Sequence, residues 1–141
     1  MSSISDQRPL YEIKANLFKG LAHPFRIRIL ELLAAAHDRA QVEAPAAEPG
    51  EMSVSALLRE TELEASHLSQ HLAVLRRHRL VGSQRRGSHV YYRLLHTRVA
   101  DMLAVVRSLV LDTLAADEKL LAEAGTLPKL HTTPLAEGER S

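Results

Sequence analysis

Arginine is the residue type whose distribution in this chain points most directly to chemistry. Between Ala65 and Ala100 there is no aspartate or glutamate, and this window holds seven arginines. The rest of the chain holds 11 basic and 17 acidic residues, which give it a net charge of −6. The overall net charge of +1 is therefore distributed very unevenly along the chain. Guanidinium groups form forked hydrogen bonds with phosphates and guanine edges, which predicts a polyanionic partner rather than a merely solvated face. The arginines of this window, called the arginine block below, are Arg76, Arg77, Arg79, Arg85, Arg86, Arg93 and Arg98.

Metal and catalytic chemistry find less support in the sequence. Cysteine is absent, which excludes disulfides, thiolate metal sites and a cysteine nucleophile. Among the eight histidines, His67 and His71 are spaced to share one helix face, but two nitrogens without a carboxylate do not fill a tetrahedral shell. The sequence has no glycine-rich phosphate loop, nucleophile elbow or H-E-x-x-H motif. We therefore predict no enzyme activity, no cofactor and no metal site.

The length of 141 residues and the 45% hydrophobic content predict one compact domain with a tail at each end. The N-terminal segment lacks the apolar core of a signal peptide, and no apolar run approaches the ~20 residues that span a bilayer. We expect a cytoplasmic protein with no membrane partner. The predicted organisation is a disordered tail over 1–8, a domain over 9–124 with a mobile loop at 37–51, and a disordered tail over 125–141.

Hydrophobic periodicity predicts a mainly α domain with a small β-hairpin. Apolar residues recur at helical spacing in five segments, whereas the valine- and tyrosine-rich stretch after Leu80 alternates as strands do. Pro24 suits the first position of a helix and Ser53 suits an N-cap, while Arg86–Gly87 supplies the predicted chain reversal. The predicted helices cover about 9–20, 24–36, 53–60, 65–78 and 96–123, and the strands cover 81–84 and 89–94.

Two short helices followed by a basic hairpin are the pattern of a winged helix-turn-helix that binds double-stranded DNA. Leu68, Leu72 and Leu75 form one inward stripe of the 65–78 helix, so the opposite face is free to enter a major groove. The predicted base-reading residues on that face are Ser66, His67, Ser69, Gln70 and Arg77. The predicted phosphate or minor-groove contacts of the wing are Arg85, Arg86 and Ser88.

The last helix indicates a second copy of the chain. Between Met102 and Ala116 it is apolar on nearly every side. A helix of that kind must be covered on more than one face, and a domain this small cannot cover it alone. We expect a symmetric homodimer that forms through the terminal helices. The candidate interface residues are Leu17, Met102, Val106, Leu109 and Val110.

Three segments, FKGLAHPFRIRILELL, LSQHLAVLRRHRLV and RRGSHVYYRL, stand in this order between about Leu10 and Leu120. Together they resemble the ArsR/SmtB family of winged-helix regulators. The resemblance implies homodimers that bind inverted-repeat operators, usually as repressors released by an inducer, and places DNA reading at Ser66, His67, Ser69 and Gln70. Two departures stand out: Glu64 and Ala65 occupy positions where members often have a capping serine and a glutamine, and the loop after Ala36 is longer than usual.

Many members of this family sense metals, but this sequence lacks the full residue sets of their metal sites. Thiolate sites need cysteine, and at the positions that match the family's last-helix site this chain has His96, Arg98, Leu109 and Asp112. Arg98 repels a cation. The signal is left open among a small molecule, a partner protein and constitutive DNA binding. The alternatives to a DNA-binding regulator are a winged-helix protein-interaction module, an RNA-binding protein, and a nickel- or zinc-responsive repressor with a non-standard His/carboxylate site.

The predicted dimer can be tested with a charge in the apolar helix. Val106→Asp or Leu109→Asp should split the dimer and with it tight operator binding, because the partner helix would have to bury a carboxylate. Sedimentation velocity of each variant beside the wild type measures the outcome. A variant that stayed dimeric would move the interface elsewhere.

Overall fold

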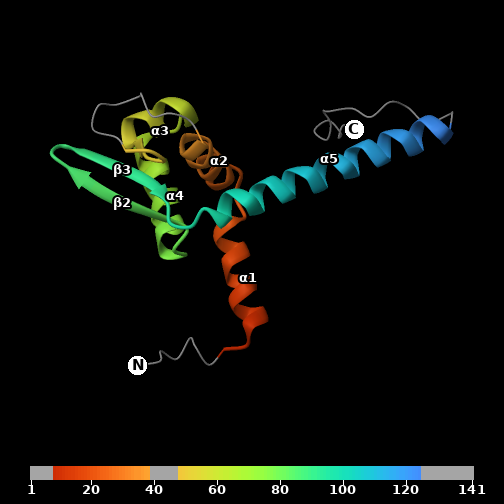
Figure 1. Ribbon diagram of the computed structural model, residues 1–141, viewed down its shortest axis with the longest axis horizontal. Coiled ribbons are helices and arrows are strands. Elements are labelled where there is room, and N and C mark those ends of the chain that lie inside the picture. The colour runs from red at the N-terminus through yellow and green to blue at the C-terminus, as the bar shows by residue number, and fades with distance from the viewer. Residues whose placement is uncertain (1–7, 39–47, 125–141) are drawn as a thin grey trace. The chain divides into compact units, whose positions relative to one another are not determined.

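The computed structural model describes residues 8–38 and 48–124. The chain divides into two units at Asp101, and each is described by itself. Figure 1 shows the helices and strands of both units. The predicted tails and most of the predicted loop lie outside the described residues. In chain order the elements are α1 (Leu10–Leu21), α2 (Pro24–Asp38), β1 (Met52–Ser53), α3 (Val54–Thr61), α4 (Ala65–Arg77), β2 (Val81–Arg86), β3 (His89–Leu94) and α5 (Arg98–Ala124).

Local signals set the helix boundaries. α2 begins at Pro24, where a missing backbone N–H costs nothing, as predicted. The Ser53 side chain accepts a hydrogen bond from the Ala56 N–H at 3.0 Å, which confirms it as the N-cap of α3. α3 ends at Glu62, whose left-handed conformation (φ 58°) turns the chain toward α4. Glu64 is the N-cap of α4 and makes no side-chain capping bond.

The core of the first unit lies between α2 and the helix-turn-helix pair, which consists of α3 and α4. The predicted inward stripe of α4 is confirmed, because Leu68, Leu72 and Leu75 are all buried. Full burial of a leucine side chain contributes roughly 1.5–3 kcal/mol, so this stripe fixes which face of α4 points outward. The largest side chains that are fully buried are Ile29, Leu30, Leu33, Leu57, Leu68, Leu75 and Val81.

The sheet has one strand more than the sequence predicts. Its order is β1-β3-β2, with all neighbours antiparallel, and β1 pairs Met52 with Tyr92 and Ser53 with Tyr91. The predicted loop at 37–51 differs accordingly, since α2 continues through Asp38 and Glu51 is buried beside β1. A strand of two residues carries no period of its own, so only its pairing with β3 reveals it.

The turn of the hairpin lies one residue later than predicted. Arg86 pairs with His89 across β2 and β3, so the reversal is Gly87–Ser88 and not Arg86–Gly87. Gly87 has φ +64°, which a two-residue hairpin of type II′ requires at its first central position. Arg86 therefore belongs to the strand, and Arg85 and Arg86 point to opposite faces of the hairpin because side chains alternate along a strand.

Large apolar side chains of α5 lie exposed along the second unit. Val106 is 47% exposed, Leu109 63% and Val110 49%, while Met102 is half-buried. In α1, the predicted interface residue Leu17 is half-buried. These exposures are what uncovered dimerisation surfaces would show, but they do not identify the covering partner. Among the described residues, no helix combines the length and the apolar character needed to cross a bilayer.

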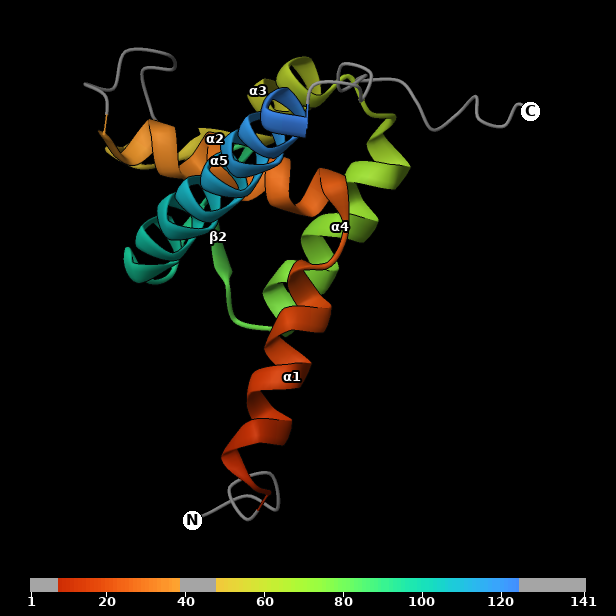
Figure 2. The same cartoon turned by 90° about the vertical axis from the view of Figure 1, so that its right-hand side faces the viewer.

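Gly20 lets the C-terminal end of α1 approach α4. The two helices are in contact there (Figure 2), and a Cβ on Gly20 would lie 2.6 Å from Cγ of the His78 ring. His78 is the C-cap of α4, so this close approach fixes α1 against the end of that helix. The ring leaves no room for a larger residue.

This packing predicts a conditional effect of adding one methyl group. Gly20→Ala should lower the free energy of unfolding by about 1–3 kcal/mol, because the imidazole must move. In a His78→Ala background the same substitution should be neutral or stabilise by up to ~1 kcal/mol, because alanine favours helix over glycine. Urea unfolding of the four proteins measures this cycle. Equal losses in both backgrounds would contradict the assigned contact.

Candidate nucleic-acid interface

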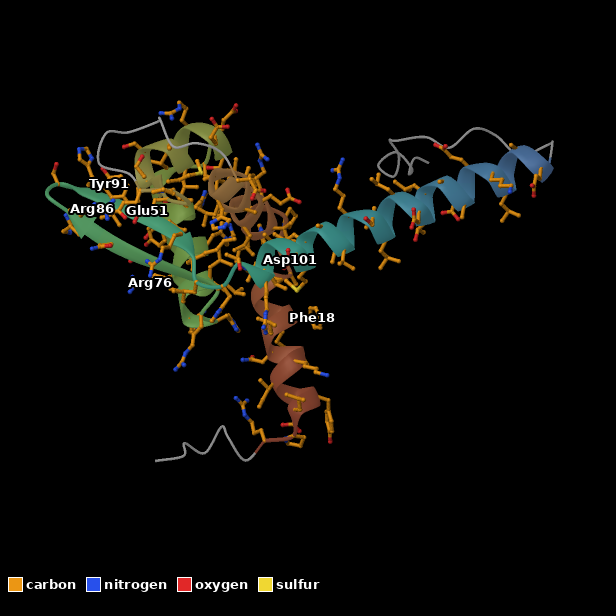
Figure 3. All side chains as sticks on the ribbon, viewed as in Figure 1. Phe18, Glu51, Arg76, Arg86, Tyr91 and Asp101 are labelled. Carbon is orange, nitrogen blue, oxygen red and sulfur yellow. The ribbon has the colours of Figure 1, made fainter. Side chains whose placement is uncertain are left out.

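The outward face of α4 carries the predicted base-reading residues. Ser66, His67, Ser69, Gln70 and Arg77 are all exposed, and the buried leucines lie on the other side of the helix. The structure therefore brings these side chains to one surface, as the helical spacing predicts. Their contacts with DNA remain a prediction. Arg76, which the sequence analysis did not assign to this face, is exposed beside Arg77 and is labelled in Figure 3.

Arg26 of α2 holds α4 in place through its guanidinium group. Its Nε donates to the Gly20 carbonyl at 2.7 Å, and its Nη2 donates to the Lys19 carbonyl at 3.3 Å. Its Nη1 lies 3.4 Å from Nδ1 of His71 on α4. One side chain thus joins the C-terminal end of α1, the first turn of α2 and the middle of α4. Because arginine only donates, Nδ1 of His71 is the acceptor in this contact.

A second ring packs against His71. The imidazole centroids of His23 and His71 are 4.3 Å apart, and Nδ1 of His23 accepts the Phe25 N–H at 3.2 Å. Burial lowers the pKa of His71, and the nearby positive groups of His23, Arg26 and His67 lower it further. His71 is thus a partly buried, hydrogen-bonded residue, and His23 lies directly before the start of α2.

The arginines of the wing differ in their surroundings. Arg85 and Ser88 are exposed, whereas Arg86 binds the Glu51 carboxylate through both terminal nitrogens. In Figure 3 the labelled side chains of Glu51, Arg86 and Tyr91 lie together at the hairpin. Burial alone would raise the pKa of Glu51, but hydrogen bonds from Arg86 and the Glu48 backbone, with the charges of Arg86 and Arg93, lower it overall.

The sequence analysis missed Glu51. Glu51 is the last residue of the predicted mobile loop, a stretch with two prolines and a glycine. Its partner Arg86 lies 35 positions later in the sequence. No local pattern links residues so far apart in sequence. The pairing appears only once β1 is placed beside β3, which brings the residue before Met52 to the hairpin.

The rest of the arginine block is exposed. This holds for Arg79 after α4, for Arg93 on β3 and for Arg98 at the start of α5. The outward face of α4 and the wing therefore carry exposed arginines. As the sequence indicates, the window from Ala65 to Ala100 holds no acidic residue that could compensate their charge. Among the described residues, no three His, Asp or Glu side chains are grouped so that they could hold a metal ion.

Comparisons with known proteins agree with this geometry. A family profile described as a helix-turn-helix domain matches residues 21–83. The HTH-type transcriptional regulator Rv0081 of Mycobacterium tuberculosis is 41% identical over 105 residues, which cover 74% of this chain and 81% of that protein. Its crystal structure matches with a TM-score of 0.63 over 79% of this chain and 98% of that chain, at 40% identity.

A solution structure adds the family name. It shows a homodimeric winged helix-turn-helix DNA-binding domain of Mycobacterium bovis, Mb0332, described as "a possible ArsR-family transcriptional regulator". The match has a TM-score of 0.58 and 30% identity over 78% of this chain and 90% of that chain. This chain belongs to the ArsR family of winged helix-turn-helix transcriptional regulators. The predicted resemblance and the predicted fold class are thereby confirmed.

Another relative is named as an activator of transcription. The transcriptional activator HlyU of Vibrio cholerae is 34% identical over 93 residues, which cover 66% of this chain and 73% of that protein. Its solved structure matches with a TM-score of 0.56 at 31% identity, over 73% of this chain and 97% of that chain. Membership of the ArsR family thus establishes a DNA-binding transcriptional regulator.

The partly buried His71 of this ArsR-family protein predicts a loss of stability in acid. Because the folded state lowers its pKa below the ordinary value of 6.5, the unfolded chain binds more protons as the pH falls through that value. The stabilisation is complete above the unfolded pKa and is lost as the pH falls toward the folded pKa. Urea unfolding between about pH 7.5 and about pH 5.5 should show this loss in the wild type and less of it in His71→Gln.

The matched control for this measurement is His67→Gln, which changes an exposed histidine one turn earlier on the same helix. It should keep more of the wild-type pH dependence than His71→Gln keeps. If His71→Gln keeps the full wild-type dependence, another group is responsible for the loss in acid.

Proposed function

We propose that this protein is a homodimeric repressor that binds an inverted-repeat operator in double-stranded DNA, with α4 in the major groove. The observation that carries the proposal is the two-sided character of α4. Three leucines bury one face, and the other presents hydroxyl, imidazole, amide and guanidinium groups. An exposed helix face of this composition, in a window with no acid, fits a surface of base edges and phosphates.

The side chains divide into two kinds of contact. Gln70 can form a bidentate pair with adenine, while the short side chains of Ser66 and Ser69 reach base edges of either kind. Arg77, which the sequence placed among the base-reading residues, lies near the C-terminal end of α4, and Arg85 lies on the wing. We assign both to the phosphates that flank the groove. The first group supports sequence selectivity, and the second supports affinity and its dependence on salt.

A dimer follows from the exposed apolar surface together with the homodimeric relative. Val106, Leu109 and Val110 stay exposed on α5, and a two-fold axis would pair this surface with itself. Two copies of α4 related by that axis would read two halves of an inverted repeat. A dimer bound to an operator that overlaps a promoter would block polymerase, and this is the mode of repression that we propose. We place the protein in the cytoplasm with the DNA it binds.

Substitutions on α4 should separate selective from general binding. Ser69→Ala and Gln70→Ala should each weaken binding to the duplex upstream of the protein's own gene, and Gln70→Ala should cost about 1–3 kcal/mol because it removes a bidentate pair. Binding to a random-sequence duplex should change little, because phosphate contacts stay intact. Fluorescence anisotropy titrations with both duplexes measure the two affinities, and Ser108→Ala on the exposed surface of α5 is the control.

Three outcomes would contradict the proposal. Equal losses of affinity for both duplexes would mean that α4 does not read bases. Duplex binding that is insensitive to salt would remove phosphate from the interface. If the wild type binds no duplex and captures a protein through the wing instead, the chain is an interaction module.

A further inference from the structure

The wing is fastened to the rest of the domain by a group of three side chains, Glu51, Arg86 and Tyr91, which we call the wing clamp. Nη1 of Arg86 donates to Oε2 of Glu51 at 3.3 Å, and Nη2 donates to Oε1, so the two planar groups meet in a forked pair. The guanidinium carbon also lies 4.3 Å from the centroid of the Tyr91 ring. A guanidinium bound by a carboxylate and stacked on an aromatic ring is held in one orientation.

The carboxylate side of the clamp is itself fixed. The side chain of Glu51 is 5% exposed, and Oε1 also accepts the Glu48 backbone N–H at 2.9 Å. The backbone N–H of Glu51 donates to the Glu48 carbonyl at 2.9 Å, and Gly50 between them has φ +85°. The next residue, Met52, begins β1 and pairs with Tyr92. Glu51 therefore presents its carboxylate from a closed turn at the edge of the sheet.

The two wing arginines have opposite relations to solvent. Arg86 shares its hairpin face with Tyr91, and its positive charge is matched by a buried negative one. Arg85 points to the other face of the hairpin and is exposed. If Arg86 turned to a phosphate, it would give up its forked pair with the buried Glu51 carboxylate, and that loss opposes the gain of the new contact.

We propose that Arg86 is a positioning residue that orients the wing through Glu51 and Tyr91, while Arg85 makes the phosphate contact. The proposal rests on the DNA-binding function proposed above and refines the sequence prediction that both arginines bind phosphate. In this account the turn that contains Glu51 sets the position from which the hairpin approaches the duplex. Arg86 thus contributes to binding without touching the nucleic acid.

The salt dependence of binding separates the two roles. The double variant Glu51→Gln/Arg86→Gln removes the clamp without changing the net charge of the protein. It should weaken binding to a random-sequence duplex while the slope of log affinity against log salt stays at the wild-type value. Arg85→Gln should reduce the magnitude of that slope by about 0.9, the value for one lost phosphate contact. If the double variant loses as much slope as Arg85→Gln, Arg86 is a phosphate ligand and the proposal is wrong.

Lysine variants supply a second test that does not need the double variant to fold. Lysine keeps the charge but lacks the forked donors. Arg86→Lys should speed hydrogen exchange of the β2 and β3 amides in the free protein, whereas Arg85→Lys and the exposed-site control Glu60→Gln should not. Unchanged exchange in Arg86→Lys would overturn the proposal.

The exchange measurement also keeps the two proposals apart. Hydrogen exchange is measured without DNA, so it tests whether Arg86 holds the wing even if the wild type binds no duplex. Absence of duplex binding by the wild type would overturn the proposed function and with it the phosphate contact of Arg85, but not the role of Arg86 in holding the wing. Fast exchange in Arg86→Lys would still establish Arg86 as the residue that orients the wing.

Discussion

The burial of one leucine stripe on α4 is the constraint on which the rest of the molecule depends. Leu68, Leu72 and Leu75 are buried in the first unit, and their removal from water decides the rotation of the helix about its own axis. Once that rotation is fixed, Ser66, His67, Ser69 and Gln70 have to face outward, whereas His71 is partly buried. The chemical character of the recognition surface is therefore a consequence of core packing. A helix with a weaker stripe would present the same side chains in no single orientation.

Arginine has two tasks in this protein, and only one of them uses free charge. Arg26 and Arg86 spend their donors inside the fold, the first on backbone carbonyls of α1 and on His71, the second on Glu51. Both hold parts of the proposed DNA-binding surface, namely α4 and the wing. Arginines such as Arg77 and Arg85 stay exposed and supply the positive potential. A count of arginines in the window thus overstates the number available to phosphate.

Local signals in the sequence predicted the helices and the identity of the outward face of α4, because caps and 3.6-residue periodicity act over short distances. Ser53, Pro24 and the leucine stripe are of this kind. Contacts between distant residues escaped prediction. The two-residue strand β1 exists only through its pairing with β3, and the bond from Arg86 to Glu51 depends on that pairing. The hairpin turn was misplaced by one residue, and this shift moved Arg86 from the tip into the strand.

The most direct test of the account is to map the DNA contact residue by residue. Nuclear magnetic resonance spectra of the labelled protein, recorded with and without the duplex from its own upstream region, report which amides change. The account predicts the largest changes at residues 65–70 of α4 and around Gly87 and Ser88, with the core of α2 little affected. Changes confined to other surfaces, with the outer face of α4 unperturbed, would contradict it.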